Sequence, residues 1–111
     1  MEYASTVADE LDPAELAAVF GALSNPARLA IMQWLKDPSD FPPQLEPAEQ
    51  VGVCLKHIQS RAGVSQSTAS QYMAVLQRAH LVTSTKIGPW VHYKRNADYL
   101  DRLAETIKTD L

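Results

Sequence analysis

Six polar side chains that lie close together in the sequence are suited to hydrogen bonding with another molecule. They are Gln66, Ser67, Thr68, Ser70, Gln71 and Tyr72. The spacing of Ala69, Met73 and Leu76 predicts a helix that buries these three residues and leaves the polar side chains outside. Hydroxyl and amide groups donate and accept hydrogen bonds without carrying charge, which suits the base edges in the major groove of DNA. We therefore predict that this helix reads DNA.

An ordinary solvated helix face is the alternative interpretation of the same residues. Solvated faces usually carry Glu and Lys, and this face carries neither. Tyr72 keeps two interpretations of its own, since its hydroxyl could reach a phosphate or its ring could pack within the domain.

Basic residues surround the predicted helix in the sequence. The 111-residue chain has a net charge of −3, yet its segment 54–97 contains six Lys or Arg residues and no Asp or Glu. A local basic surface attracts phosphates even when the whole chain is acidic. The residues predicted to contact the DNA backbone or a minor groove are Arg61, Arg78, Lys86, His92, Lys94 and Arg95. The alternative is that they are solvated, with lysines on a strand discouraging edge-to-edge pairing.

Capping residues and hydrophobic periodicity predict the elements that position these groups. Asp12 and Asn25 each precede a proline and are typical helix caps, and Ser65 and Asn96 cap two later helices. Gly88-Pro89 is a turn between two strands rich in aromatic and β-branched residues. The predicted order is helices 12–23, 26–36, 54–62 and 65–80, strands 81–86 and 90–95, and a last helix after residue 96. This mainly α fold with a β-hairpin (α+β) is the layout of a winged helix-turn-helix.

The chain has the length of one domain. We expect residues 11–111 to form it and residues 1–10, which show no periodicity, to form a flexible arm. Residues 37–50 contain four prolines and are predicted as a stiff loop, with a short strand after it at 51–53. The single cysteine excludes a disulfide within the chain. No apolar run could span a bilayer and the first residues lack a signal-peptide pattern, so we expect a cytoplasmic protein without membrane contact.

Four segments, taken in order, are similar to bacterial repressors of the ArsR/SmtB family. They are FGALSNPARLAIM at 20–32, GVSQSTASQYMAVL at 63–76, AHLV at 79–82 and GPWVHYK at 88–94. The resemblance covers roughly residues 16–107, apart from a proline-rich loop that is longer than usual. It implies a homodimer that binds a partly palindromic operator in double-stranded DNA and leaves it when a signal arrives.

A second copy is also expected on physical grounds. One helix reads only a few base pairs, and specificity normally needs two such helices set about 34–36 Å apart. The first and last helices carry apolar stripes that a small domain leaves uncovered. The residues predicted at the dimer interface are Leu16, Val19, Phe20, Leu100, Leu103 and Ile107.

Cys54 is the residue whose type suggests sensing. Metal-sensing members of the family carry two cysteines spaced one apart here, where this chain has Gly52 and Cys54. A second family site uses Asp and His on the last helix, which here contains no His. The three histidines are scattered in the sequence, so we predict no metal site and no cofactor. Cys54 stays open between a thiol sensor and a small buried residue, and the second is favoured.

These patterns predict a sequence-specific DNA-binding transcriptional regulator, in the simplest form a repressor released by a small effector or other signal that the sequence does not identify. The alternative is a winged-helix module that binds protein or RNA, which the absence of acidic residues from segment 54–97 disfavours. An enzyme is not predicted. Cys54 and His57 are one helical turn apart and could form a nucleophile–base pair, but nothing supplies a third orienting group.

Overall fold

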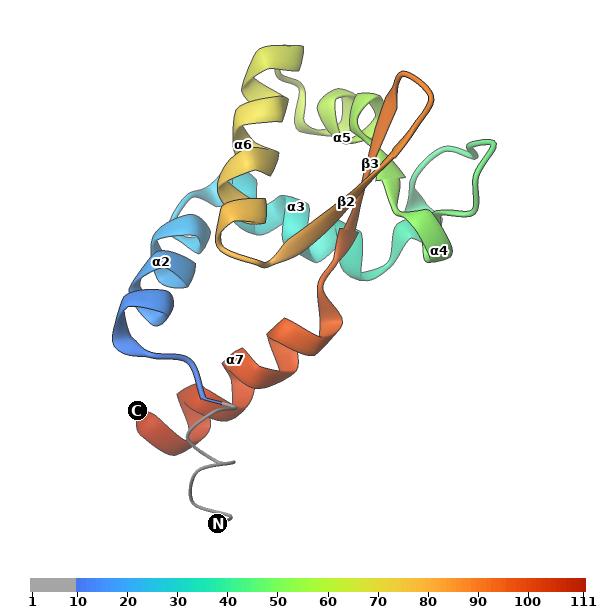
Figure 1. Ribbon diagram of the computed structural model, residues 1–111. Helices are drawn as coiled ribbons and strands as arrows, with labels where there is room; N and C mark the ends of the chain where they lie inside the picture. Colours follow the sequence, from blue (N-terminus) through green and yellow to red (C-terminus); the bar gives the residue numbers. More distant parts are fainter. Residues whose placement is uncertain (1–9) are drawn as a thin grey trace.

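Residues 10–111 are described by the computed structural model of the chain (Figure 1). Its elements are α2 (Pro13–Leu23), α3 (Pro26–Lys36), the 3-10 turn η1 (Pro38–Asp40), α4 (Ala48–Val51), β1 (Val53–Cys54), α5 (Leu55–Ala62), α6 (Gln66–Arg78), β2 (Val82–Ile87), β3 (Trp90–Arg95) and α7 (Ala97–Asp110). The predicted arm at residues 1–10 lies outside the described residues, apart from Glu10. Within residues 10–111, no helix is long and apolar enough to cross a membrane.

Four helices begin at their predicted capping residues. The Asp12 carboxylate accepts the Glu15 amide at 2.8 Å, and Glu15 Oε1 accepts the Asp12 amide in return. Asn25, Ser65 and Asn96 cap α3, α6 and α7 with one side-chain oxygen each. A cap satisfies backbone donors that have no partner inside the helix, so a signal local to the sequence is enough to place each start.

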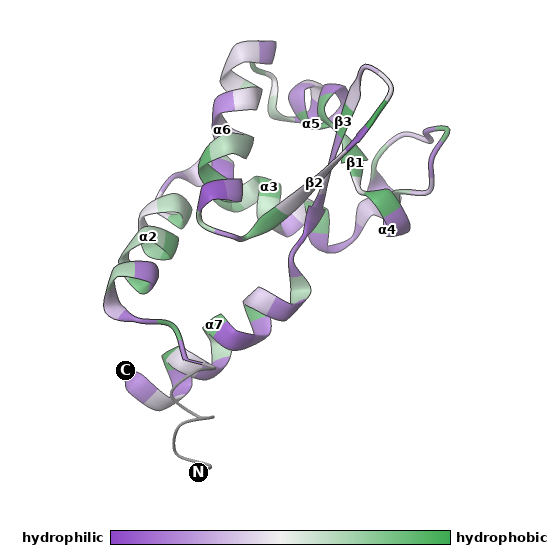
Figure 2. Cartoon of the chain, viewed as in Figure 1, coloured by the Kyte–Doolittle hydropathy of each residue, from purple (hydrophilic) through white to green (hydrophobic). Residues whose placement is uncertain are grey.

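The hydrophobic core lies where α3, α5 and α6 pack against one another and against the sheet. Its fully buried side chains include Ile31, Ile58, Met73, Leu76 and Leu81. Ala69, Met73 and Leu76 have no exposed surface, which confirms the predicted buried face of α6. In Figure 2 hydrophobic residues gather where α6, α3 and the start of β2 meet. The core therefore fixes α6 from behind and leaves its other face free.

A three-stranded antiparallel sheet, in the order β1-β3-β2, carries a projecting hairpin. We call β2, β3 and the turn between them the wing. The two strands pair from Val82 opposite Arg95 at the base to Ile87 opposite Trp90 beside the turn. The predicted hairpin is confirmed, with β2 one residue later than expected.

β1 is two residues long and places Cys54 opposite His92 of β3. The strand predicted at 51–53 begins too early, because Gly52 turns the backbone with a φ of 97° just before the pairing starts. A Cβ on Gly52 would collide with the carbonyl group of Tyr93. Only glycine fits here without displacing β1 from β3.

Residues 37–50 were predicted to form a loop throughout. The structure differs, because η1 and the start of α4 lie within this segment. Its middle is held by one side chain. Gln44 Nε2 donates to the carbonyl oxygens of Glu46 and Gly52, and Gln44 Oε1 accepts the Cys54 amide at 3.1 Å. This amide ties the proline-rich segment to β1.

Candidate nucleic-acid interface

The helix-turn-helix is formed by α5, a turn at Gly63 and α6. Gly63 adopts a left-handed conformation, with φ 68° and ψ 35°, and its amide donates to the carbonyl oxygens of Gln59 and Ser60. This closes α5 and redirects the chain into α6. The beginning of α6 and the turn of the wing then lie at the same end of the molecule, away from α7 (Figure 1).

The predicted reading residues of α6 have different degrees of exposure. Gln66, Ser67 and Gln71 are exposed, and Thr68, Ser70 and Tyr72 are half-buried. The Tyr72 ring packs against the hydrophobic core, which supports the packing interpretation of this residue. The Thr68 hydroxyl accepts a hydrogen bond from Ser65 Oγ at 3.0 Å, so it also helps to order the first turn. The face as a whole is polar, uncharged and open.

The wing places Lys86 beside the turn, where its side chain is exposed. β2 is exposed along its outer residues, Thr83 to Lys86. α6 is joined to the wing by Gln77, whose Nε2 donates to Ser84 Oγ at 3.0 Å. This hydrogen bond connects α6 directly to the wing.

Lys94 and Arg95 stand at the other end of the wing. They pair with Thr83 and Val82 at the base of the hairpin, about 17–20 Å along the strand from the turn. Lys94 Nζ donates to the carbonyl oxygen of Gln50 at 3.4 Å. The structure therefore does not bring these two bases together with Lys86, and their role as DNA contacts stays a prediction.

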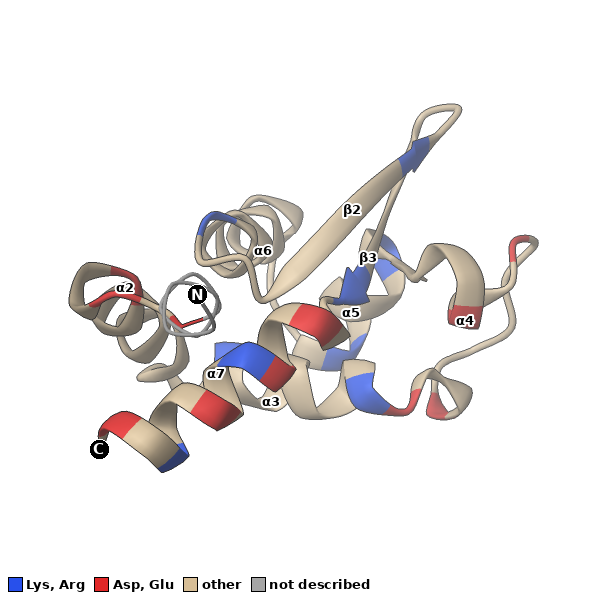
Figure 3. Ribbon diagram, turned by 60° about the horizontal axis from the view of Figure 1, so that its bottom comes forward, with Lys and Arg blue, Asp and Glu red and all other residues tan. Residues whose placement is uncertain are grey.

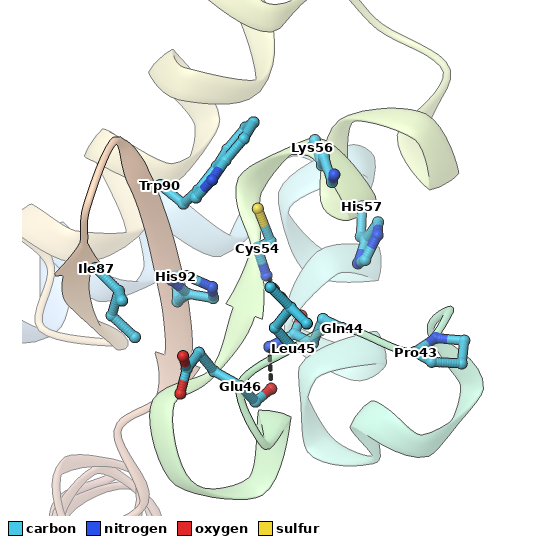
Figure 4. A pocket seen from close by; sticks show the side chains of 10 residues that line it. All are labelled: Pro43, Gln44, Leu45, Glu46, Cys54, Lys56, His57, Ile87, Trp90 and His92. Atoms are coloured by element: carbon cyan, nitrogen blue, oxygen red, sulfur yellow. Dashed lines mark hydrogen bonds between the residues drawn. The ribbon is translucent and has the colours of Figure 1, made fainter.

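His92 was predicted to contact the DNA backbone, and this prediction is wrong. Only 5% of His92 is exposed. The reason is the third strand. β1 pairs Cys54 with His92 and brings the start of α5 beside it, so the His92 side chain lines a cavity there (Figure 4).

Arg61 and Arg78 lie at different places on the helix-turn-helix, and both are exposed. The Arg61 guanidinium lies over the Trp34 and Phe41 rings, 4.6 and 5.1 Å from their centroids. Its edge stays free to donate to a phosphate while its face is occupied. Arg78 ends α6, about 18 Å along the helix from Gln66.

The predicted dimer residues divide into two groups. Val19 and Leu103 are 0% and 6% exposed within a single chain, so they belong to the core of one subunit and their assignment to the interface is wrong. Leu16 and Leu100 are half-buried and pack on that core. Phe20 and Ile107 are 42% and 39% exposed. These last two residues and the 43% exposed Leu29 are exposed apolar side chains that a second subunit could cover.

Charge is separated across the fold. Figure 3 shows Asp and Glu on α2, α7 and the segment from α3 to α4, and none on α6 or the wing. Helix α6 carries Arg78 in its last turn and no charge before it. A polyanion would therefore meet neutral hydrogen-bonding groups on α6 with basic residues around them.

Cys54 is 4% exposed and its amide is held by Gln44. This agrees with the favoured interpretation of a small buried residue and leaves its reactivity untested. Sequence spacing did not indicate that His57 and His92 line the same cavity as Cys54. Within residues 10–111, no group of three or more His, Cys, Asp or Glu could hold a metal ion.

Comparison with known proteins agrees with this arrangement. No protein-family model matches the chain. The chain is 41% identical over 95 residues to the helix-turn-helix-type transcriptional regulator YbzH of Bacillus subtilis, itself uncharacterized, a match that covers 84% of this chain and 95% of that one. The solved structure of an ArsR-like transcriptional regulator from Rhodococcus sp. RHA1 is also similar, with a TM-score of 0.65, 27% identity and coverage of 86% and 77%. The chain belongs to the ArsR family of transcriptional regulators.

A second similar structure is that of a homodimer. It is the homodimeric winged helix-turn-helix DNA-binding domain of Mb0332 from Mycobacterium bovis, with a TM-score of 0.59, 23% identity and coverage of 85% and 78%. The predicted winged helix-turn-helix fold is confirmed. This ArsR-family chain is a DNA-binding transcriptional regulator.

Proposed function

We propose that this regulator is a homodimeric repressor that binds a partly palindromic operator and leaves it when a signal arrives. It acts by binding rather than by catalysis, in the cytoplasm, where bacterial DNA lies. Helix α6 discriminates between bases through Gln66, Ser67 and Gln71. Phosphate contacts come from the basic residues around it, with Lys86 first among them.

The observation that carries this proposal is the open, uncharged face of α6 within a segment that has no acidic residue. Amide side chains pair with adenine, and hydroxyl groups bond several base edges. A dimer that sets two such helices about 34–36 Å apart would read two half-sites one DNA turn apart.

Binding-site selection from random double-stranded DNA tests the proposal directly. We expect an enriched sequence with two related half-sites. Replacing Gln66 and Gln71 together by Ala should lower the ratio of specific to non-specific affinity by roughly tenfold or more, because each bidentate pair is worth about 1–3 kcal/mol of discrimination. Lys36→Gln, a change on the exposed end of α3, is the control and should leave the ratio unaltered.

Two results would contradict the proposal. Failure to enrich any DNA sequence would favour a winged-helix module that binds protein or RNA. An enriched sequence whose preference survives the double substitution would remove α6 from base reading.

A further inference from the structure

A cleft of about 500 Å³ lies between the start of α5, the wing and the proline-rich segment (Figure 4). Three pieces of chain that are distant in sequence line it, at positions 43–46, 54–57 and 87–92. Its volume falls within the range of small-molecule sites, about 300–1,000 Å³. The proposed DNA contacts on α6 are not part of it.

Two imidazole nitrogens in this cleft lack a partner. His57 Nδ1 and His92 Nδ1 are buried and make no hydrogen bond within the described residues. His92 as a whole is 95% buried, given its 5% exposure, and its ring lies among the lining residues in Figure 4. Buried polar atoms are nearly always satisfied, because an unpaired one costs free energy. Two residues that carry such atoms line the same cleft, and a ligand that reaches the two atoms would supply their missing partner.

Gln44 is not that partner in this structure. Its amide nitrogen and oxygen are engaged by the carbonyl oxygens of Glu46 and Gly52 and by the Cys54 amide. Gln44 lines the cleft, and the two imidazole rings are among the groups there that can still bond a ligand.

The Lys56 ammonium group lies at one end of the cleft. Lys56 Nζ lies 4.9 Å from the Trp90 ring centroid, beside His57. Burial, with Lys56 and His92 nearby, lowers the pKa of His57. Glu46, the acidic residue of the lining, lies at the opposite end in Figure 4. An anionic group at this end of the cleft would be attracted by the Lys56 ammonium group.

The other walls are apolar and partly exposed. Leu45 is fully exposed and Trp90 is 51% exposed, although both are large hydrophobic residues. Ile87 completes this side of the cleft. A flat ring packed against Leu45 and the exposed part of the Trp90 indole would cover this surface, with its substituents toward Lys56 and the two histidines.

We propose that this cleft binds a planar aromatic molecule that carries an acidic oxygen, as a carboxylate or a phenolate. Occupancy weakens DNA binding, for two reasons. The anion neutralises Lys56 within the basic segment, and the ring is inserted between α5 and the wing, whose position is tied to α6 through Gln77 and Ser84. The effect on DNA rests on the proposed function, whereas binding itself does not.

Titration of the full-length protein with 2-naphthoate tests the binding, followed by tryptophan fluorescence and calorimetry. A ligand of this size that fits a pocket should have a Kd of about 1 mM or tighter. The matched probe is 2-naphthamide, which has the same shape without the charge. We expect it to bind roughly tenfold more weakly, since a hydrogen bond to a charged group is the stronger kind. No binding of 2-naphthoate, or equal binding of the two probes, would overturn the proposal.

Substitutions then locate the site. Lys56→Gln should weaken 2-naphthoate binding about fivefold or more, and Lys36→Gln, an exposed lysine outside the cleft, should not change it. His92→Leu should weaken it about tenfold, whereas His92→Asn keeps a polar atom near the Nδ1 position and should retain affinity within about threefold. If His92→Leu does not fold, the two lysine variants decide. Equal affinity in Lys56→Gln and the unsubstituted protein would overturn the assignment.

A DNA-retention assay separates the two proposals. We expect 2-naphthoate to release the selected operator in the unsubstituted protein and to do so less effectively in Lys56→Gln. Probe binding without any operator binding would contradict the proposed function and leave the cleft assignment standing. Operator binding without probe binding would do the reverse, and probe binding that leaves operator affinity unchanged would overturn the coupling.

Discussion

Gly52 occupies a position next to β3 where no side chain fits. Its backbone has a φ of 97° and a ψ of −176°, and a Cβ there would meet the backbone of Tyr93 and Lys94. The paired cysteines of metal-sensing family members would need a side chain at this position. In this chain the backbone opposes that arrangement, because a side chain at position 52 would collide with β3.

Substitution of Gly52 should therefore destabilise the fold more than substitution of another positive-φ glycine. We expect Gly52→Ala to lower the free energy of unfolding by about 3 kcal/mol, from backbone strain and the clash with β3. Gly63→Ala should cost only about 1 kcal/mol, because φ at Gly63 is 68° and nothing lies within 4 Å of its added Cβ. Urea denaturation measures both, and an equal decrease in the two variants would show that β1 yields to the extra atom.

His57 should make stability depend on pH. Burial first, then Lys56 and His92, lower the pKa of His57 below its usual 6.5. As pH falls, the unfolded chain takes up a proton at His57 before the folded chain does. The stability that the neutral His57 contributes is therefore full above pH 6.5 and is lost as pH falls from that value through the lower pKa of the folded chain. Melting temperature should fall between pH 7.5 and 5.5, and His57→Asn should reduce the fall. An identical pH profile for the variant would remove His57 as its cause.

Side-chain direction was the part of the site that local sequence did not predict. Exposure on α6 follows from helical spacing, which Ala69 and Met73 reveal within one segment. His92 lies on β3, and its burial depends on segments that are far away in the sequence, among them the strand that carries Cys54. Val19 is a similar case, since an apolar stripe does not say whether its own chain or a second copy covers it.

At the scale of elements, the caps allowed the helices to be predicted, whereas the segment before β1 was described less well. A capping residue acts within one turn, and so do the signals at Asp12 and Ser65. The short helix α4 has no side-chain cap at its start. Instead, the Gln44 amide donates to the carbonyl oxygens of Glu46 and Gly52, which lie before and after α4 in the sequence. Four prolines indicated stiffness but not these turns.

The wing and α6 are expected to contribute differently to DNA binding. Lys86→Gln should make the slope of log K against log salt concentration shallower by about 0.9 for each phosphate that the protein no longer neutralises. The ratio of specific to non-specific affinity should change little, because a bond to a phosphate carries no base information. Lys94→Gln, at the base of the wing, measures whether that region reaches DNA. An unchanged slope for Lys86→Gln would place the wing tip away from the phosphates.

At the scale of the whole molecule, the uncovered apolar side chains on the helical part of the fold should mediate dimerisation. Phe20 and Ile107 are exposed apolar residues on α2 and α7. Replacing both by Asp should yield monomers, because two buried charges without partners oppose association. Leu45→Asp changes a fully exposed apolar residue at the cleft and should leave the dimer intact. Sedimentation equilibrium measures the mass, and dimers of the double variant would move the interface elsewhere.

The neutral face of α6 also bears on how such a regulator could change its target. Since this helix offers amides and hydroxyl groups while the charge lies around it, operator preference and general attraction to DNA belong to different residues. New operator sequences could be acquired by exchanging a few polar side chains for others of similar size. The protein would keep its rate of searching along the chromosome, its sensitivity to ionic conditions and its cleft, and only the sequence at which it stops would differ.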